Sequence, residues 1–208
     1  KVKGEAGEYP YDYVVIASGS RPNYYGIEGA SQYTYSLWSH EAAVRLNGRI
    51  HQAFQKAQSM TNEKERRKLL SFWIIGAGFS GVEMVSELAD YVPVLCKEYG
   101  IRREEVTLYN VDGLGRVVPN LTEKLSAIAE KKLKKLQVQV LLNTKVNSIG
   151  EDYIDLKKGD EVTRYEAGTV IWTAGTQCEA VSSQSDGELE CCRGRIQVDE
   201  YLRSTVDK

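Results

Sequence analysis

The chain has 208 residues, of which 42% are hydrophobic, enough for a core within one large domain or one and a half ordinary ones. Its 27 basic and 29 acidic side chains leave a formal charge of −2, so no electrostatic attraction to nucleic acid is indicated. No apolar run reaches the roughly 18 to 20 residues that span a bilayer, and the N-terminus has no signal-peptide centre, so we expect a cytoplasmic globular protein.

The cysteines and histidines do not form a recognisable ligand set. They are Cys96, Cys178, Cys191, Cys192, His40 and His51. Their spacing matches neither C-x-x-C nor a zinc site, and no histidine has a partner at ligand distance in sequence. The adjacent cysteine pair invites a redox interpretation, but its polar context in a reducing compartment favours ordinary thiols. We therefore expect no metal site.

The first third of the chain predicts a strand, a loop and two helices. Residues 13–17, YVVIA, indicate a buried strand that ends in a turn cluster at 18–22. Residues 23–36 are rich in tyrosine, glycine and serine and are predicted to form a crossing loop. Ser39 is the expected N-cap of an amphipathic helix. A second, highly charged helix is predicted from Thr61, with its charges on a solvated face.

A glycine loop at the centre of the chain carries the strongest motif. Residues 72–75 form a continuous apolar run, which suits a strand buried on both faces of a parallel sheet. Gly76, Gly78 and Gly81 follow at the spacing G-x-G-x-x-G, and an amphipathic helix continues from them. Such glycines permit a tight turn, close approach of a pyrophosphate and close packing of helix on strand. This context favours a dinucleotide site over an ordinary glycine-rich turn.

The helix after the loop is predicted from Phe79 to about Tyr91, because Pro93 interrupts the helical hydrogen bonds, with helical structure resuming to residue 99. Residues 106–109 then predict a second strand. Asn110 is expected at its end, where it would meet an adenosine ribose. Asp112 could substitute for Asn110 if the following loop folds back.

The last third of the chain predicts a long helix and several strands. Thr122 is the expected helix cap. The expected apolar stripe of that helix comprises Leu125, Ile128, Ala129 and Leu133. Residues 138–142 indicate a strand, and residues 144–165 an antiparallel meander. A buried strand in 168–176 repeats the pattern of residues 13–17, and residues 194–202 indicate one further strand. The fold class predicted is α/β: a Rossmann-like nucleotide-binding domain with a central parallel sheet, helices on its faces and a β-meander.

Several segments, in this order, resemble the nicotinamide-binding half of the two-dinucleotide flavoprotein reductases, and most closely the type II NADH dehydrogenases. They are YDYVVIASGSRPN, EAAVRLNGRIHQAFQKA, NEKERRKLLSF, IIGAGFSGVE, RVVPNL, TVIWTAGT and GRIQVDEYL. The resemblance implies that residues 1–22 belong to an FAD-binding domain, residues 23–176 to an inserted NAD(P)H-binding Rossmann domain, and residues 177–208 to a return segment.

The resemblance also implies an activity and its partners. In this family NADH passes hydride to FAD, and the reduced flavin gives electrons to a quinone at the membrane surface. For the whole enzyme we therefore expect NADH, FAD and quinone as ligands, a peripheral position on the inner face of the membrane, and a possible homodimer. NADPH remains an alternative to NADH, because Asn110 stands where the family usually has an acid.

The binding residues implied by the resemblance lie in four places. In the loop, Gly76, Gly78 and Gly81 would hold the pyrophosphate. Phe79 and Ser80 would line the loop, and Ala77 belongs to the same binding segment. Glu83 would lie near the nicotinamide ribose, although an acid there also suits the helix dipole. Asn110 would contact the adenosine ribose. The residues expected beside the nicotinamide are Ala174, Gly175 and Thr176. No residue is assigned a catalytic or metal-binding role.

Two features limit the expected activity of these 208 residues. The 208 residues hold no second G-x-G-x-x-G, and the Gly-Asp element that binds a flavin beyond residues 194–202 in this family is missing. We therefore expect a fragment that binds nicotinamide nucleotide without holding FAD or turning over. The alternatives are a ferredoxin or sulfide:quinone reductase, for which Cys178 is a weak redox candidate, and a non-catalytic nucleotide-sensing module.

Overall fold

A computed structural model describes residues 1–178, 191–192 and 195–204, and the chain forms two compact units. One comprises Lys1–Arg21 with Thr176–Lys208, and the other is Pro22–Gly175. The first contains short strand pairs: β1 (Val2–Gly4) with β2 (Gly7–Tyr9), β3 (Ser20–Pro22) with β12 (Thr176–Cys178), and β13 (Cys191–Cys192) with β14 (Arg195–Ile196). The predicted division into an FAD-binding part and an inserted domain stays a prediction.

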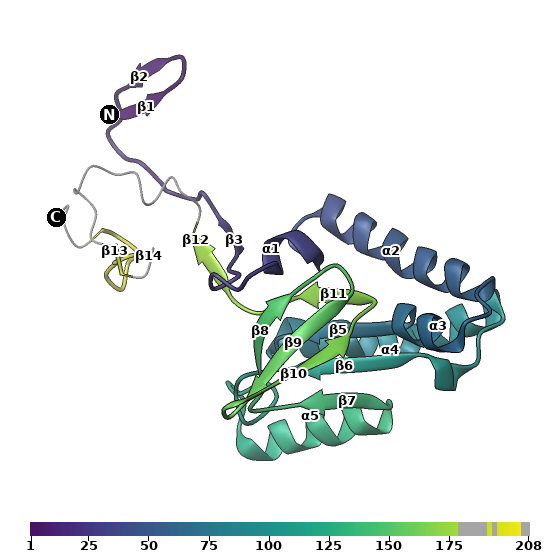
Figure 1. The fold of residues 1–208 in the computed structure, drawn as a ribbon. Helices are drawn as coiled ribbons and strands as arrows, with labels where there is room; N and C mark the ends of the chain where they lie inside the picture. Colours follow the sequence, from purple (N-terminus) through teal and green to yellow (C-terminus); the bar gives the residue numbers. More distant parts are fainter. Residues whose placement is uncertain (179–190, 193–194, 205–208) are drawn as a thin grey trace. The chain divides into compact units, whose positions relative to one another are not determined.

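The larger unit is built on a five-stranded parallel sheet in the order β4-β11-β5-β6-β7 (Figure 1). Its strands are β4 (Thr34–Ser36), β11 (Thr169–Trp172), β5 (Ser71–Ile75), β6 (Thr107–Val111) and β7 (Val138–Leu141). Of these five strands, β11 comes last in the sequence and lies between the first two, β4 and β5. An antiparallel meander accompanies the sheet, in the order β10 (Glu161–Glu166), β9 (Tyr153–Lys158) and β8 (Lys145–Ile149).

Helices connect the parallel strands. They are α1 (Ala30–Tyr33), α2 (His40–Gln58), α3 (Glu63–Leu69), α4 (Phe79–Tyr99), the 3₁₀ turn η1 (Arg103–Glu105) and α5 (Glu123–Lys135). As predicted, Ser39 caps α2, accepting a hydrogen bond from the Ala42 amide, and Thr122 caps α5, accepting one from the Leu125 amide. Each cap satisfies a first-turn amide that has no partner within its helix.

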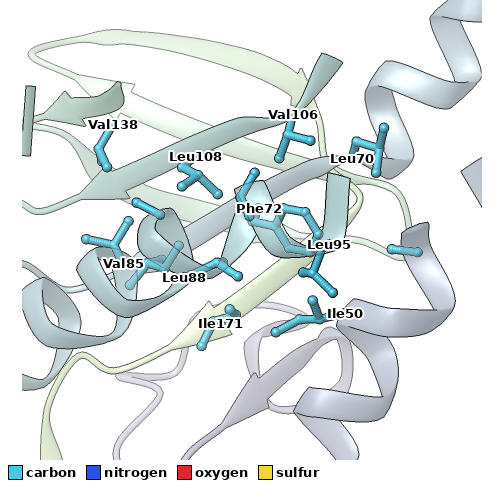
Figure 2. Packing of buried hydrophobic residues seen from close by; sticks show 14 of the residues in the cluster. Ile50, Leu70, Phe72, Val85, Leu88, Leu95, Val106, Leu108, Val138 and Ile171 are labelled. Carbon is cyan, nitrogen blue, oxygen red and sulfur yellow. The ribbon is translucent and has the colours of Figure 1, made fainter. Parts of the chain in front are cut away.

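The central strand β5 is buried along its whole length because both faces of the sheet are covered. Phe72 and Ile74 pack with the apolar residues of α2 and α4, as Figure 2 shows for Phe72 beside Leu88 and Leu95. Their neighbours Trp73 and Ile75 point the other way and pack against the meander. This alternation is the two-residue period of a strand, so the predicted buried strand, parallel sheet and meander are confirmed.

Pro93 does not interrupt the helix after the glycine loop, contrary to expectation. Helix α4 runs unbroken through it and ends at Gly100, whose φ of 66° is left-handed. Proline removes one helical hydrogen bond. Here Val92 and Leu95, on either side of it, are buried in the core, and this packing holds the helix together.

The charged helix α3 differs from its prediction in its start and in its surroundings. Asn62, not Thr61, is the N-cap, accepting hydrogen bonds from the amides of Lys64 and Glu65. Its charges are not all solvated: Arg66 Nη2 lies 2.6 Å from Glu105 Oε2, and Glu105 is 3% exposed. A buried carboxylate is stable only with a cationic partner, and Glu105 of η1 finds one in Arg66 of α3. This ion pair therefore connects the two elements.

Residues 13–17 do not form the predicted buried strand. Tyr13 is 95% exposed and Val15 is also exposed, and no segment among the described residues pairs with this stretch. The apolar pattern of these residues is typical of a strand. A strand forms only where a neighbouring strand supplies hydrogen-bond partners for its N–H and C=O groups, and this stretch has none among the described residues.

Three further expectations need correction. The predicted loop 23–36 contains α1 and the edge strand β4. On α5, Leu125 and Ile128 of the predicted stripe are 47% and 56% exposed, whereas Leu133 is buried. In the predicted strand 194–202, only Arg195–Ile196 is a strand, and residue 194 lies outside the described residues.

Candidate functional site

The glycine loop lies at the carboxyl edge of the parallel sheet, between β5 and α4. The Gly76 amide donates to the Val111 carbonyl oxygen at 2.8 Å, and the Val118 amide donates to the Ala77 carbonyl oxygen at 2.7 Å. The loop is therefore fixed to the segment that follows β6. Ligands of open parallel sheets bind at this edge, where the loops leave the strands.

Two of the three glycines are required by the packing of the loop. Gly76 has a φ of 105°, and a Cβ there would lie 3.0 Å from the Ala174 amide nitrogen. At Gly81 a Cβ would collide with the Gly76 carbonyl oxygen, so helix and loop can approach each other only without a side chain. At Gly78 a Cβ would meet no protein atom within 4 Å. Gly78 is thus the position where the backbone is open to a ligand.

The N-terminus of α4 provides the anion-binding end of the site. This helix of 21 residues begins after Gly78, and no side chain caps its first amides. Phe79 and Ser80 are exposed in its first turn. Free amides and the positive end of the helix dipole favour a phosphate group at this place, so the loop fits a pyrophosphate. Glu83 is exposed one turn into the helix.

Asn110 does not end the second strand, contrary to the sequence prediction. Strand β6 continues to Val111, and Asn110 is 0% exposed, so its side chain does not reach a surface where a ribose could bind. Its Nδ2 donates to the carbonyl oxygens of Ile74 at 3.3 Å and Gly76 at 2.9 Å. The residue that follows the strand is Asp112.

The chain after β6 folds back so that Asp112 lies against the glycine loop. Its Oδ2 accepts a hydrogen bond from the Ala77 amide at 2.6 Å, and its Oδ1 accepts one from the Leu114 amide at 2.8 Å. Two backbone donors thus fix a half-buried carboxylate beside the loop. The sequence identified Asp112 only as a substitute, although the β-branched Val111 before it and the Asp-Gly turn after it indicated where the strand ends.

The end of β11 forms the opposite wall of the loop. Thr173 Oγ1 donates to the Ile75 carbonyl oxygen at 2.7 Å and lies 3.4 Å from that of Gly76. Ala174 packs with the apolar cluster on the meander side, and a Cβ at Gly175 would collide with the Tyr25 side chain. Thr176 begins β12 in the other unit. The sequence did not predict Thr173, whose hydroxyl has a role only because β11 lies beside β5.

Other side chains of the described chain do not suggest a second chemistry. Burial raises the pKa of the Cys96 thiol, which disfavours a reactive thiolate. Among the described residues no cluster of three or more histidine, cysteine or acidic side chains could hold a metal ion. In the same part of the chain, no helix combines the length and the apolar character needed to cross a membrane.

Comparisons with known proteins agree with this geometry. The family model for pyridine nucleotide-disulphide oxidoreductases matches residues 1–208. A type II NADH:quinone oxidoreductase of Mycobacterium tuberculosis is 31% identical over 203 residues, which cover 94% of this chain and 43% of that protein. One from Staphylococcus saprophyticus is 29% identical over 196 residues, with 94% of this chain and 48% of that protein covered. The chain therefore spans about half the length of these curated relatives.

Solved structures show the same fold at low sequence identity. NDH2 from Plasmodium falciparum in complex with NADH has a TM-score of 0.78 and 23% identity, covering 84% of this chain and 36% of that one. The sulfide:quinone oxidoreductase of Aquifex aeolicus has a TM-score of 0.73 and 15% identity, covering 97% of this chain and 45% of that one.

Proposed function

Because the chain belongs to the pyridine nucleotide-disulphide oxidoreductase family, we propose that its larger unit, Pro22–Gly175, binds NADH for an NADH:quinone oxidoreductase. The observation that carries the proposal is the glycine loop: Gly78 is open to a ligand at the uncapped N-terminus of α4. In the whole protein, NADH is oxidised and a quinone is reduced.

The loop residues bind and orient the dinucleotide. Amides of the first turn of α4, from Phe79 and Ser80, donate to the pyrophosphate, whose charge is stabilised by the helix dipole. Ala174 and Gly175 follow β11 on the other side of the loop and border the nicotinamide. Ala174 and Gly175 have no large side chain of their own, and the ring of Tyr25 lies against Gly175 at this place. Glu83 lies on the same helix and accepts a hydrogen bond from the nicotinamide ribose.

Asp112 selects NADH. Its two oxygens each accept one backbone hydrogen bond and retain a lone pair for the hydroxyl groups of the adenosine ribose. A 2′-phosphate at the same place would be repelled by the carboxylate. Asp112 therefore takes the role that the sequence gave to Asn110, and it favours NADH over NADPH.

FAD supplies the two-electron chemistry of the proposed reaction when it is bound. The 208 residues hold one G-x-G-x-x-G motif and so provide one dinucleotide site, and we place the FAD site in the rest of the whole protein. A quinone is dissolved in the membrane, so the whole protein meets it from the membrane surface. The proposal also places the whole protein on the inner face of that membrane and includes a homodimer.

Titration of the 208-residue chain by calorimetry tests nucleotide binding and its specificity. We expect NADH to bind more tightly than NADPH. Asp112→Asn removes the carboxylate charge, so NADH affinity falls about 10-fold, the value of one good hydrogen bond, and the preference over NADPH narrows. Asp90→Asn, an exposed change further along α4, is the control and should leave both affinities unchanged. No binding of either nucleotide at millimolar concentration contradicts the proposal.

A further inference from the structure

The side chain of Asn110 is an unusual feature of the sheet. Asparagine is disfavoured within strands, and Asn110 is a fully buried one in β6, opposite Ile74 of the central strand. On the same face of β6, two residues earlier, Leu108 is part of the apolar core. An amide at such a position destabilises the fold unless its polar atoms find partners.

The hydrogen bonds of Asn110 go to the glycine loop and the end of the strand before it. Nδ2 donates to the carbonyl oxygens of Gly76 and Ile74, whereas Oδ1 is buried and has no hydrogen-bond partner among the described residues. The orientation of the amide is therefore fixed, because the opposite one would set its oxygen against two carbonyl oxygens. Both hydrogens of the Asn110 amide nitrogen are therefore directed at these two carbonyl oxygens.

The bond to Gly76 is one of three side-chain hydrogen bonds to a single peptide group, of which the longest, at 3.4 Å, comes from Thr173 Oγ1. The Gly76 carbonyl oxygen accepts from Asn110, and the amide of the same peptide, on Ala77, donates to Asp112. A peptide group is planar, so its oxygen and its N–H cannot turn independently. Two side chains of one segment, at positions 110 and 112, thus fix the plane of the Gly76–Ala77 peptide from both ends.

We propose that Asn110 is a positioning residue for the dinucleotide: through Gly76 it fixes the peptide plane that directs Gly78 and the first amides of α4 at the pyrophosphate. The inference rests on the proposed function but concerns a side chain that does not touch the ligand. The Ala77 amide of the loop also keeps the Asp112 carboxylate in place. The binding of the pyrophosphate and the binding of the adenosine ribose therefore both depend on the orientation of the loop.

An acidic substitution tests this role through its pH dependence. In Asn110→Asp (N110D) the ionised carboxyl faces two carbonyl oxygens, whereas the protonated form can donate to Gly76 as the amide does. Burial and the nearby charge of Asp112 raise the pKa of the introduced carboxyl. The charged side chains around this segment include Lys145, which would meet a Cβ at Gly113, and Glu83 at the start of α4, whereas β5 and β7 contribute none.

Calorimetry with ADP-ribose, a redox-inert probe that keeps the pyrophosphate, should be done on the 208-residue chain between pH 5.5 and 8.5, a range of about three units around neutrality. We expect N110D to bind about 10-fold more weakly than the wild type at the high end and to recover at the low end. Asn110→Leu, which has no donor, should be weaker at every pH. The control is Thr169→Val. It removes a buried hydroxyl of β11 that accepts a hydrogen bond from Arg49 of α2, and it should bind ADP-ribose like the wild type.

A second measurement needs no ligand. Hydrogen exchange at the Ala77 amide, compared with the wild type at equal pH, should be about 10-fold faster in N110D at high pH and in Asn110→Leu, and unchanged in Thr169→Val. Unchanged Ala77 protection in both Asn110 variants overturns the inference, as does an N110D deficit that is independent of pH. Failure of the wild type to bind ADP-ribose would instead contradict the proposed function, and the exchange measurement would still decide the role of Asn110.

Discussion

Gly81 shows how a single missing side chain determines the geometry of the loop. A Cβ at this position would collide with the Gly76 carbonyl oxygen and lie 2.8 Å from Thr173 Oγ1, closer than Cβ contacts normally come. The same carbonyl oxygen is the acceptor for Asn110. A methyl group at position 81 therefore displaces an atom that several side chains use.

We expect Gly81→Ala to lower the free energy of unfolding by about 1 to 3 kcal/mol, the usual result of inserting atoms into a packed site. ADP-ribose binding should weaken in parallel. Urea unfolding measures the first effect and calorimetry the second. Gly48→Ala in α2 is the matched control, because a Cβ there meets nothing and alanine is the better helix former by about 1 kcal/mol. If Gly81→Ala were as stable as Gly48→Ala, the close contact would have no energetic importance.

At this scale the sequence could predict what depends on local geometry and not what depends on neighbouring strands. The glycines at 76 and 81 were predictable because their spacing after an apolar run has one structural explanation. The roles of Asn110 and Asp112 were not, since the end of β6 is set by its pairing with β5 and β7. The strand was predicted to end two residues too early, and the ribose contact was therefore assigned to the buried Asn110 rather than to Asp112 beside the loop.

Among the elements, the meander has one buried acid whose side chain contacts both neighbouring strands, in addition to their backbone pairing. Asp155 in β9 accepts two hydrogen bonds from Arg164 of β10, at 2.8 Å each, and one from Ser148 of β8, also at 2.8 Å. The Arg164 guanidinium holds the pKa of Asp155 below its usual value, and burial opposes this effect without reversing it. The three strands are therefore linked through a single ionised carboxylate.

The pH dependence of stability follows from this depressed pKa. The unfolded chain takes up a proton near pH 4 and the folded chain only at lower pH, so the contribution of Asp155 is fully present above about pH 4 and is lost as pH falls below it. We expect Asp155→Asn to lower the free energy of unfolding by about 1.5 to 3 kcal/mol at pH 7. The gap should narrow towards pH 3.

Urea unfolding of the wild type and Asp155→Asn at several pH values measures this gap. Asp160→Asn, in the exposed turn between β9 and β10, changes the same chemical group without those partners and should have little effect. A difference between wild type and Asp155→Asn that stays constant from pH 7 to about pH 3 would mean that the charge of Asp155 is not what stabilises the meander.

Element predictions succeeded where the pattern was local and failed where packing decided. The caps Ser39 and Thr122 have short-range partners and were predictable. Pro93 was expected to break α4, but the buried residues around it outweigh the loss of one hydrogen bond. Leu125 and Ile128 have the spacing of a buried stripe, yet α5 turns its Leu133 side to the core and leaves them exposed.

For the whole molecule, both apolar core clusters belong to one unit. All their members lie between residues 22 and 175, on the two faces of the parallel sheet. The first unit has short strand pairs, and its most apolar stretch, residues 13–17, is exposed. The sequence correctly indicated a strand-like pattern there. It could not show that the described residues contain no strand to pair with it.

We therefore expect residues 22–175 alone to fold cooperatively and to bind ADP-ribose as the 208-residue chain does. The midpoint of thermal unfolding, followed by circular dichroism, should agree between the two within about 4 °C, the shift that 1 kcal/mol produces in a domain of this size. A Gly81→Ala version of the shorter chain provides a destabilised reference. A much lower midpoint for residues 22–175 would show that the outer segments contribute to the core.

The position of β11 has a consequence for synthesis on the ribosome. Residue 170 pairs with residues 34 and 73, so a strand made late in translation fills the place between two made early. Until it arrives, β5 has an unpaired edge and the apolar residues of both core clusters that it covers are exposed. Such long-range closure slows folding and leaves the nascent chain open to aggregation. The growing polypeptide therefore keeps this edge of β5 unpaired until Trp172 has left the exit tunnel.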